Sequence, residues 1–154
     1  MDRFFFDRYS LIERDLERYL AEALSQGGDY ADLYFEYTTT SSILLDESLV
    51  KSATEGISMG CGVRVIAGEQ TGYAYTDDLA PERILKAARI AARITGGPAR
   101  ISTIGLSGVE PSHNFYPVAL PSTDRELADK LELVFRGDGA ARAYDARIRQ
   151  VRVF

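Results

Sequence analysis

Cysteine and histidine are almost absent from this chain of 154 residues. There is one of each, Cys61 and His113, and tryptophan is missing altogether. A single chain with these counts cannot form a disulfide, a Cys-x-x-Cys redox pair or a zinc site made only of Cys and His ligands. A Ser-His-Asp or Cys-His catalytic unit would have to use His113. We therefore expect no catalytic residues, no metal and no cofactor in this chain.

Long apolar runs and an excess of positive charge are missing as well. No uninterrupted apolar run approaches the ~20 residues of a membrane-spanning helix, and the first seven residues are too short and too acidic for a signal peptide. The net charge is −5, whereas binding to a phosphate backbone needs clustered Lys and Arg. We therefore expect a cytoplasmic protein that binds neither nucleic acid nor membranes.

The spacing of apolar residues predicts two to three helices. Each helix signal combines a capping box or an early proline with apolar residues three and four apart. The expected helices run from Ser10, in a capping box with Glu13, to Gly27-Gly28; from Pro81 through Ile94, where Gly96-Gly97-Pro98 ends the helix; and from Thr123, in a capping box with Glu126, through Val134. Gly137-Asp138-Gly139 interrupts the last pattern before a further helical turn, Ala140–Tyr144.

Alternation of apolar and polar residues predicts several short strands with tight turns between them. The expected strands cover residues 31–37, 43–45, 49–54, 57–65 and 70–76, with a final strand over Arg147–Phe154. Successive strands with short turns favour an antiparallel meander. The sequence therefore predicts a single α+β domain over residues 1–154, in which helices pack on a mainly antiparallel sheet of four to five strands plus the C-terminal strand.

Glycines in the best of these strands resemble part of a nucleotide-binding motif. Gly60-x-Gly62 could open a dinucleotide fingerprint, but Val65 stands where the third glycine should be. The residues that follow continue the strand, so no helix N-terminus is available for a phosphate. We interpret the glycines of this region as residues that allow bulges, tight turns or close backbone approach; they are Gly56, Gly60, Gly62, Gly68 and Gly72.

Other candidate residues have ordinary structural explanations. Near Glu110, His113 lies in a proline-rich stretch and is interpreted as a surface residue, and Cys61 as a small buried apolar residue. Basic residues on one face of the Ala-rich helix form either an anion-binding stripe or, as we favour, its solvated side; they are Lys86, Arg89 and Arg93. Tyrosines on the strands are either a binding surface or half-buried strand residues, an alternative that the sequence leaves open; they are Tyr30, Tyr34, Tyr37, Tyr73 and Tyr75.

The stretch from Gly60 to Asp77, GCGVRVIAGEQTGYAYTD, resembles the signature of the TldD/PmbA family, also named "modulator of DNA gyrase". Further elements that are similar to the family occur in the expected order along nearly the whole chain. They are ADLYFE from Ala31, ESLV from Glu47, NFYP from Asn114 and AYDARIRQV from Ala143. The segment Tyr73–Thr76 favours the TldD branch over the PmbA (TldE) branch.

The resemblance implies a function for a longer protein. Members are about three times longer, are cytoplasmic zinc metallopeptidases that act on unfolded peptides, and carry a His-Glu-x-x-x-His zinc site and a further cysteine ligand in a C-terminal domain. TldD pairs with its paralogue to enclose a cavity. This chain contains none of the zinc motif, so the resemblance implies a non-catalytic N-terminal domain that contacts its own C-terminal domain, forms a homodimer or a heterodimer with a TldE/PmbA-like paralogue, and helps to enclose a peptide substrate.

Residues of the signature are the candidates for contacts with that cavity. They are Gly60, Gly62, Arg64, Gly72, Tyr73 and Tyr75. The family's pattern also implies a continuous helix where Gly137-Asp138-Gly139 lies. Because the sequence stops within the strand pattern at Val151–Phe154, we expect the chain to be a fragment.

Two other functions remain open at this point. One is a free-standing module that captures extended peptides by adding a strand at an open sheet edge. The other is a gyrase-associated regulatory protein, which only the family's older name suggests.

Overall fold

The computed structural model describes residues 4–96, 106–109 and 117–154. None of the helices in these ranges has the length and apolar character needed to cross a membrane. His113, which we interpreted as a surface residue, and the nearby Glu110 lie outside the described residues. The elements in chain order are α1 (Phe4–Tyr9), α2 (Glu13–Leu24), β1 (Tyr30–Asp46), β2 (Leu49–Ala67), β3 (Gln70–Thr76), α3 (Pro81–Thr95), the 3₁₀ helix η1 (Ser122–Asp124), α4 (Leu127–Tyr144) and β4 (Arg152–Val153).

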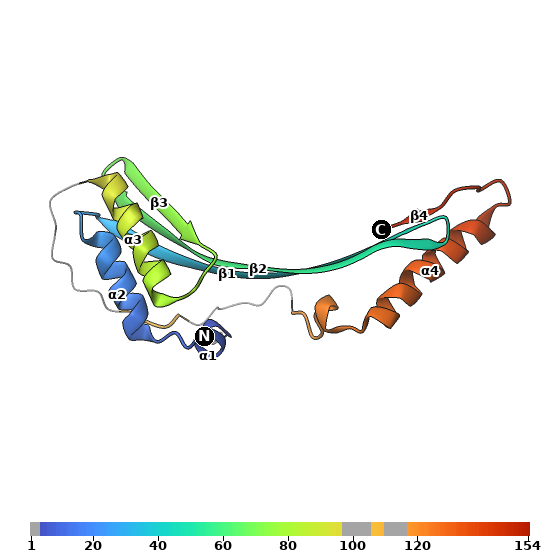
Figure 1. The fold of residues 1–154 in the computed structure, drawn as a ribbon, viewed down its shortest axis with the longest axis horizontal. Helices are drawn as coiled ribbons and strands as arrows, with labels where there is room; N and C mark the ends of the chain where they lie inside the picture. The colour runs from blue at the N-terminus through green and yellow to red at the C-terminus, as the bar shows by residue number, and fades with distance from the viewer. Residues whose placement is uncertain (1–3, 97–105, 110–116) are drawn as a thin grey trace. The chain divides into compact units, whose positions relative to one another are not determined.

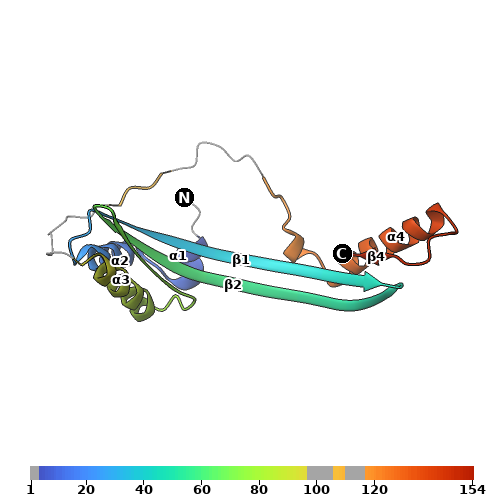
Figure 2. The same cartoon turned by 90° about the horizontal axis from the view of Figure 1, so that it is seen from above.

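The predicted α+β class with a mainly antiparallel sheet is confirmed. Four strands form one sheet in the order β3-β2-β1-β4, and β1 and β2 lie side by side in both views of the ribbon (Figure 1, Figure 2). The meander has fewer and longer strands than predicted, because β1 and β2 run without interruption through the expected breaks at residues 38–42 and 55–56. The final strand is also shorter than the predicted Arg147–Phe154.

Hydroxyl side chains explain why the strands continue through the polar run. The hydroxyls of Ser42 and Thr54 lie 2.7 Å apart, and Thr40 Oγ1 donates to the Gly56 carbonyl at 3.5 Å. Thr is well suited to strands, and cross-strand hydroxyl pairs stabilise neighbouring strands. Polar composition therefore marks an exposed segment here and not a loop.

Two tight turns connect the three long strands. Glu47 and Ser48, between β1 and β2, both have positive φ, 55° and 58°, as a two-residue type I′ hairpin turn requires. Between β2 and β3, Gly68 has a φ of 57°, and Ala67 pairs with Gln70. Both turns agree with the positions predicted from the sequence.

The chain divides into two compact units, and the first contains residues up to Tyr37 and from Ser58 to the end of α3. In this unit α2 and α3 lie beside each other and against the sheet (Figure 1). The core between them consists of apolar residues from both helices and from alternate positions of β2, including the fully buried Tyr19, Ile84 and Val63. Aromatic residues of α1, such as Phe5, pack on its margin.

Backbone atoms of α3 and β3 approach each other closely at Gly72. A Cβ atom on Gly72 would collide with the carbonyl oxygen of Ala91 and would lie 3.3 Å from Cβ of Ile94. The small residues of α3, among them Ala87, Ala88 and Ala91, are almost completely buried. An Ala-rich helix face can pack this close to a sheet only where the strand also has no side chain.

Two predicted capping boxes are wrong. Ser10 has a φ of 53°, which is not the extended conformation of an N-cap residue, and α2 instead begins after Ile12, whose N–H donates to the Asp15 carboxylate at 3.3 Å. Thr123 lies inside η1, so α4 begins after Glu126.

The predicted end of α3 is confirmed, whereas the predicted interruption of α4 is wrong. The helix from Pro81 ends as predicted, with Gly96 in the left-handed region. The expected interruption at Gly137-Asp138-Gly139 is absent, since α4 continues through these residues to Tyr144, as the family's pattern implies.

The second unit contains residues 38–57 and the described residues from Pro117 to Phe154. Its buried apolar residues are Ile43, Leu45 and Val151, and Leu45 pairs with Val153 of β4. Next to these residues, Asp138 is 5 % exposed and accepts hydrogen bonds from Ser48 Oγ at 2.6 Å and from Arg142 Nε at 3.0 Å. A carboxylate at a glycine-flanked position of α4 thus holds the turn between β1 and β2.

We expect Gly72→Ala to destabilise the first unit by about 1–3 kcal/mol, because overpacked sites force backbone shifts. Hydrogen exchange of α3 and β3 amides measures the effect. Gly139→Ala is the matched control, because a Cβ there meets nothing within 4 Å and Ala is the better helix former by about 1 kcal/mol. Unchanged exchange in Gly72→Ala would contradict the packing described here.

We expect Ser48→Ala to destabilise the second unit by about 1–3 kcal/mol, because it leaves the buried Asp138 carboxylate without one of its donors. Local hydrogen exchange of α4 amides is the measurement. The Asp138→Asn, Ser48→Ala double variant should lose less than the sum of the two single variants, since the two residues interact directly. Additive effects would show that the hydrogen bond contributes nothing.

We expect the Cys61 thiol to react with a disulfide reagent only when the protein unfolds. Cys61 is 1 % exposed, and burial raises the pKa of its thiol to about 12, so the reactive thiolate is scarce at neutral pH. This pKa lies above that of the thiol in the unfolded chain, which ionises first as the pH rises. The contribution of Cys61 to the free energy of unfolding is therefore fully present below about pH 9 and falls as the pH rises toward 12. Rapid labelling of the native protein at pH 8 would disprove this.

Candidate functional site

One face of the sheet in the first unit is left open by the helices. Along β2 the side chains of Cys61, Val63 and Val65 are buried against α2 and α3, so the alternate residues Gly60, Gly62 and Arg64 belong to the other face. On β3, Gly72 lies against α3, and its neighbours Tyr73 and Tyr75 are 56 % and 75 % exposed. On β1, the 62 % exposed Tyr34 belongs to the same face, because Leu33 and Phe35 pack on the core.

These residues form a shallow groove of about 240 Å³ on the open face. We call it the tyrosine groove; its walls are Tyr34, Glu36, Gly60, Gly62, Tyr73, Tyr75 and Asp77, with Ser58, Met59 and Cys61 completing the lining. Among the described residues that line the groove, two side chains are carboxylates and none is basic. Three phenol rings and two carboxylates thus surround a glycine floor.

Glycine at position 62 makes room for one of the rings. A Cβ on Gly62 would lie 2.7 Å from Tyr73 Oη and 3.2 Å from two of its ring carbons. The ring of Tyr73 therefore covers the Gly62 backbone, although Gly62 pairs with Tyr75 and Tyr73 pairs with Arg64. The glycine that resembles a nucleotide motif serves instead as the floor beneath a tyrosine, which confirms its interpretation as a site of close approach.

A hydrogen bond between neighbouring residues of β1 fixes another wall of the groove. Tyr34 Oη donates to Glu36 Oε2 at 3.0 Å, and this bond together with the negative charge of Glu36 raises the pKa of the Tyr34 phenol. The Tyr34 phenol therefore keeps its proton to a higher pH than an unperturbed tyrosine does. The same hydrogen bond holds the Glu36 carboxylate beside the Tyr34 side chain.

Arg64 lies on the open face but does not contribute to the groove. Its guanidinium donates to both carboxylate oxygens of Asp32, at 2.9 and 2.8 Å, and this pairing raises the pKa of the arginine. Bidentate pairs of this kind fix the geometry of both side chains. The only basic residue predicted for the site is thereby neutralised by a carboxylate of β1.

The structure brings together four of the six predicted candidates. Gly60, Gly62, Tyr73 and Tyr75 line the groove, whereas Arg64 is paired beside it and Gly72 lies on the opposite face. The acidic residues of the groove were not among the sequence candidates. Glu36 could have been found, since strand alternation places it on the same face as Tyr34. Asp77, which follows β3, has no such signal.

The basic residues on one face of α3 form the solvated side of the helix, which is the interpretation that we favoured over an anion-binding stripe. Lys86, Arg89 and Arg93 are all exposed. Arg89 Nε donates to Glu22 Oε1 of α2 at 3.0 Å, which pairs the two helices. The stripe is the solvated side of an amphipathic helix.

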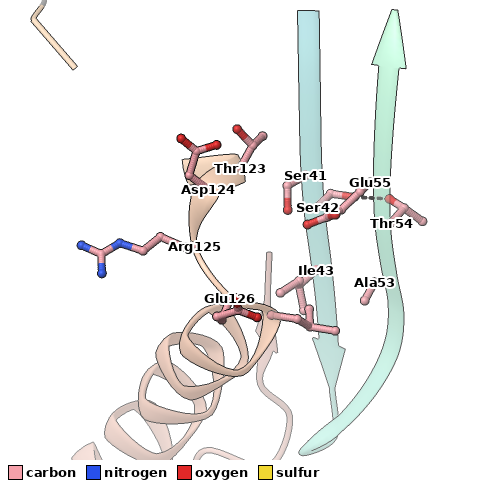
Figure 3. A pocket seen from close by; sticks show the side chains of 11 residues that line it. Ser41, Ser42, Ile43, Ala53, Thr54, Glu55, Thr123, Asp124, Arg125 and Glu126 are labelled. Atoms are coloured by element: carbon pink, nitrogen blue, oxygen red, sulfur yellow. Dashed lines mark hydrogen bonds between the residues drawn. The ribbon is translucent and has the colours of Figure 1, made fainter. Parts of the chain in front are cut away.

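A second, more polar pocket lies in the second unit, with a volume of about 420 Å³. Hydroxyl groups of β1 and β2 form one wall, and the residues that join η1 to α4 form the other (Figure 3). Glu55, Asp124, Arg125 and Glu126 supply charges of both signs. The hydroxyl-rich sequence from Thr38 to Ser42 indicated a polar segment but not this pocket.

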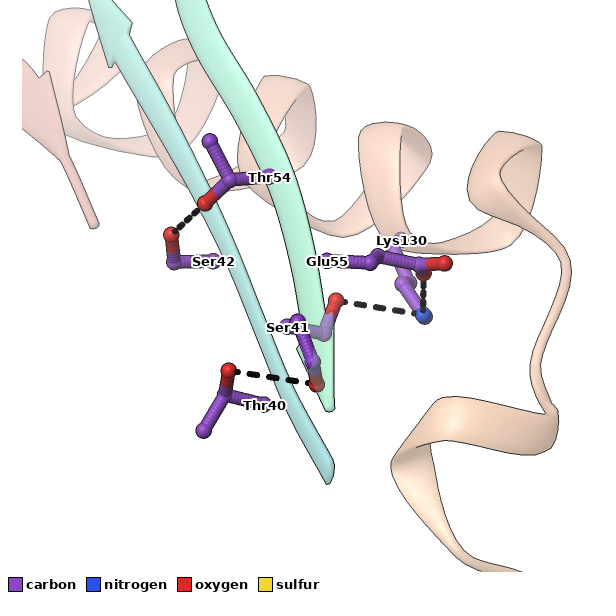
Figure 4. A network of polar contacts seen from close by, with 7 residues as sticks. Thr40, Ser41, Ser42, Thr54, Glu55 and Lys130 are labelled. Carbon is purple, nitrogen blue, oxygen red and sulfur yellow. Dashed lines mark hydrogen bonds and ion pairs between the residues drawn. The ribbon is translucent and has the colours of Figure 1, made fainter. Parts of the chain in front are cut away.

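Beside that pocket, Lys130 is held by two partners and is only 13 % exposed (Figure 4). Its Nζ donates to Glu55 Oε1 at 2.8 Å and to Ser41 Oγ at 3.2 Å. A lysine that activates a serine must be neutral to accept its proton, whereas this one is ion-paired. The cluster therefore stabilises the packing of α4 on β1 and β2 and has no catalytic arrangement.

The described residues do not fit a zinc site. They contain no group of three or more Cys, His, Asp or Glu side chains that could hold a metal ion. The thiol of Cys61 is buried with a raised pKa, whereas zinc binds the thiolate.

Residues 31–95 of this chain match the family model of the PmbA/TldA metallopeptidase domain 1. The chain is similar to the metalloprotease TldD homologue of Buchnera aphidicola subsp. Acyrthosiphon pisum, with 30 % identity over 90 % of this chain and 29 % of the relative. It is also similar to the TldD homologue of Haemophilus influenzae, with 33 % identity over 80 % of this chain and 26 % of the relative. The chain thus spans less than a third of the length of these relatives.

A solved structure with the same fold is that of TldE from Thermococcus kodakarensis. The TM-score is 0.51 at 20 % identity, and the match covers 86 % of this chain and 29 % of that one. The domain model and the similarity to the TldD homologues show that residues 31–95 of this chain are the first domain of the PmbA/TldD metallopeptidase family.

Proposed function

We propose that this chain is the non-catalytic N-terminal domain of a TldD-like zinc-dependent metallopeptidase that acts on unfolded peptides. The observation that carries the proposal is the match of residues 31–95 to domain 1 of the family. In the relatives named metalloprotease, the segment that matches this chain makes up less than a third of the whole protein. The catalytic metal would then be held by a C-terminal domain, in keeping with the poor fit of the described residues to zinc.

The proposed role of this domain is to shape the peptide cavity and to take part in subunit assembly. The tyrosine groove supports the first part, because concave aromatic surfaces with a few polar groups are typical of binding sites. Exposed apolar side chains in the second unit support the second part, because such groups usually mark surfaces that partners cover; they include Leu49, Val50, Leu133 and Phe135. The proposed partners are its own C-terminal domain and a second subunit, either a copy or a TldE/PmbA-like paralogue.

One observation favours a second candidate, a peptide-binding module that adds a strand at a sheet edge. In the sheet order, β4 is the outer neighbour of β1 but pairs only with Leu45 and Asp46. Within the described residues no other strand pairs with that side of β1. An extended peptide could use such an edge for backbone hydrogen bonds.

We expect the purified chain to contain no stoichiometric zinc and to cleave no unfolded peptide, since it lacks a set of zinc ligands. The same peptides should be cleaved when the chain is covalently continued by, or assembled with, a C-terminal domain that carries the zinc motif. Metal analysis and a fluorogenic peptide assay are the measurements, with the Cys61→Ala variant as a control that leaves zinc content unchanged. Zinc at one ion per chain or turnover by the chain alone would disprove the proposal.

A further inference from the structure

We propose that the outer edge of β2 is an interface at which a second copy of this chain adds its own β2, antiparallel and related by a twofold axis at Ala53. This interface deepens the proposed function and rests on it only in giving the domain a part in subunit assembly. The second subunit is then a copy of this chain, and the residues of the two strands that face each other are fixed.

The outer edge of β2 is unpaired over the part of the strand that belongs to the second unit. β3 pairs with this edge only from Cys61 to Ala67, and within the described ranges no other strand pairs with it before Cys61. α4 and β4 lie on the β1 side of this part of the sheet (Figure 2, Figure 3). The outward backbone groups of Leu49–Ile57 are therefore available to another strand.

Exposed apolar side chains accompany this edge. Every residue from Leu49 to Ile57 is exposed, and the two end residues themselves are 61 % and 65 % exposed. Natural edge strands are usually protected by proline, by charges or by a bulge. The segment LVKSATEGI contains no proline and only two charged residues, which have opposite signs. An edge of this kind is suited to strand addition.

The sequence of the segment is complementary to itself in the antiparallel direction. When two copies of the strand lie with their Ala53 residues opposite each other, Leu49 of each copy faces Ile57 of the other. Lys51 of each copy then faces Glu55 of the other, and both pairs occur twice because the arrangement is symmetric. Apolar pairs and pairs of opposite charge are the cross-strand pairs that stabilise neighbouring strands.

Other registers lose this complementarity. A shift by one residue places Lys51 opposite Thr54 or Gly56 and leaves no pair of opposite charges. A shift that places Lys51 opposite its own copy brings like charges together, which is destabilising. In the symmetric register Ser52 faces Thr54 as well, so that hydroxyl groups meet on the second face of the strands.

Glu55 already has a partner within its own chain, and the interface does not displace it. Glu55 Oε1 accepts a hydrogen bond from Lys130 Nζ at 2.8 Å, while the Glu55 side chain is 63 % exposed. A carboxylate has two oxygens that accept several hydrogen bonds, so Lys51 of the second copy adds to this ion pair. The attraction comes chiefly from backbone hydrogen bonds and the apolar pairs, and the charged pair fixes the register.

Cysteine cross-linking tests the register. Ala53→Cys should form a disulfide between two copies under mild oxidation, because opposite Cα atoms lie about 4.5–5.5 Å apart. Neither Leu49→Cys nor Ile57→Cys should cross-link by itself, since the two copies of either residue lie about 27 Å apart along the strands. A mixture of these two variants should cross-link. Non-reducing electrophoresis is the measurement, and Cys61, 1 % exposed, stays unreactive in every variant.

Charge reversal tests the interface without any added thiol. Sedimentation of the chain of 154 residues over a range of concentrations should show a monomer–dimer equilibrium, because small interfaces are weak. Lys51→Glu should weaken the dimer about tenfold, since a favourable pair becomes repulsive at two places. The matched control Lys86→Glu makes the same change of net charge at an exposed position of α3 and should have far less effect. Circular dichroism of each variant confirms that it is folded.

A monomer at every concentration, cross-linking of Ile57→Cys alone as readily as of Ala53→Cys, or equal effects of the two charge reversals would each overturn the inference. A longer chain, continued by a C-terminal domain, that protects the amides of residues 49–57 from exchange while it stays monomeric would also overturn it and assign the edge to that domain.

None of these results bears on the zinc and cleavage assays that test the proposed function. Conversely, a chain that cleaves peptides alone but cross-links through Ala53→Cys would disprove the proposed function and leave this interface intact.

Discussion

The close contact between α3 and β3 at Gly72 decides which face of the sheet is buried. Because the Ala91 carbonyl occupies the place of a side chain on Gly72, the helix can lie directly on the strand. The alternation of side chains then requires Tyr73 and Tyr75 to point away from the helices. The core of β2 and the open face that carries the tyrosine groove are thus two consequences of one packing constraint.

The glycines of β2 and β3 owe their positions to packing on both faces of the sheet. Gly72 admits a helix backbone on one face, and Gly62 admits a tyrosine ring on the other. A glycine-rich strand normally loses stability through the entropy of the unfolded chain. Here the cost is offset where the missing Cβ atoms allow close contacts that no other residue would permit.

In the second unit, the hydrogen-bonded carboxylate of Asp138 holds the elements together, whereas apolar contacts do so in the first unit. Asp138 connects the turn at Ser48 to Arg142 of α4, and Asp46 accepts a hydrogen bond from Arg152 that lowers the pKa of its carboxyl group. The few buried apolar residues nearby, such as Leu45 and Val151, leave much of the specificity to these polar contacts. Buried polar groups need complete hydrogen bonding, which fixes their geometry.

The sequence by itself determined the fold class, the tight turns, the helix from Pro81 and the burial of Cys61, because these depend on local periodicity and on turn residues. It did not determine that β1 and β2 continue through the hydroxyl run, since cross-strand partners such as Ser42 and Thr54 are distant in the chain. Nor did it place the starts of α2 and α4, since Ser10 has a positive φ and α2 begins only after Ile12, while α4 begins after Glu126.

The tyrosine groove depends both on the sequence pattern of the strands and on the tertiary structure. Strand alternation placed Tyr73 and Tyr75 on one face, and the sequence left open whether that face binds a ligand or is half buried. Only the tertiary structure decided that the helices cover the other face, that Glu36 and Asp77 join the tyrosines, and that Arg64 is engaged by Asp32. Apart from the Tyr34–Glu36 pair within β1, these contacts join residues of different elements, which no local pattern in the sequence specifies.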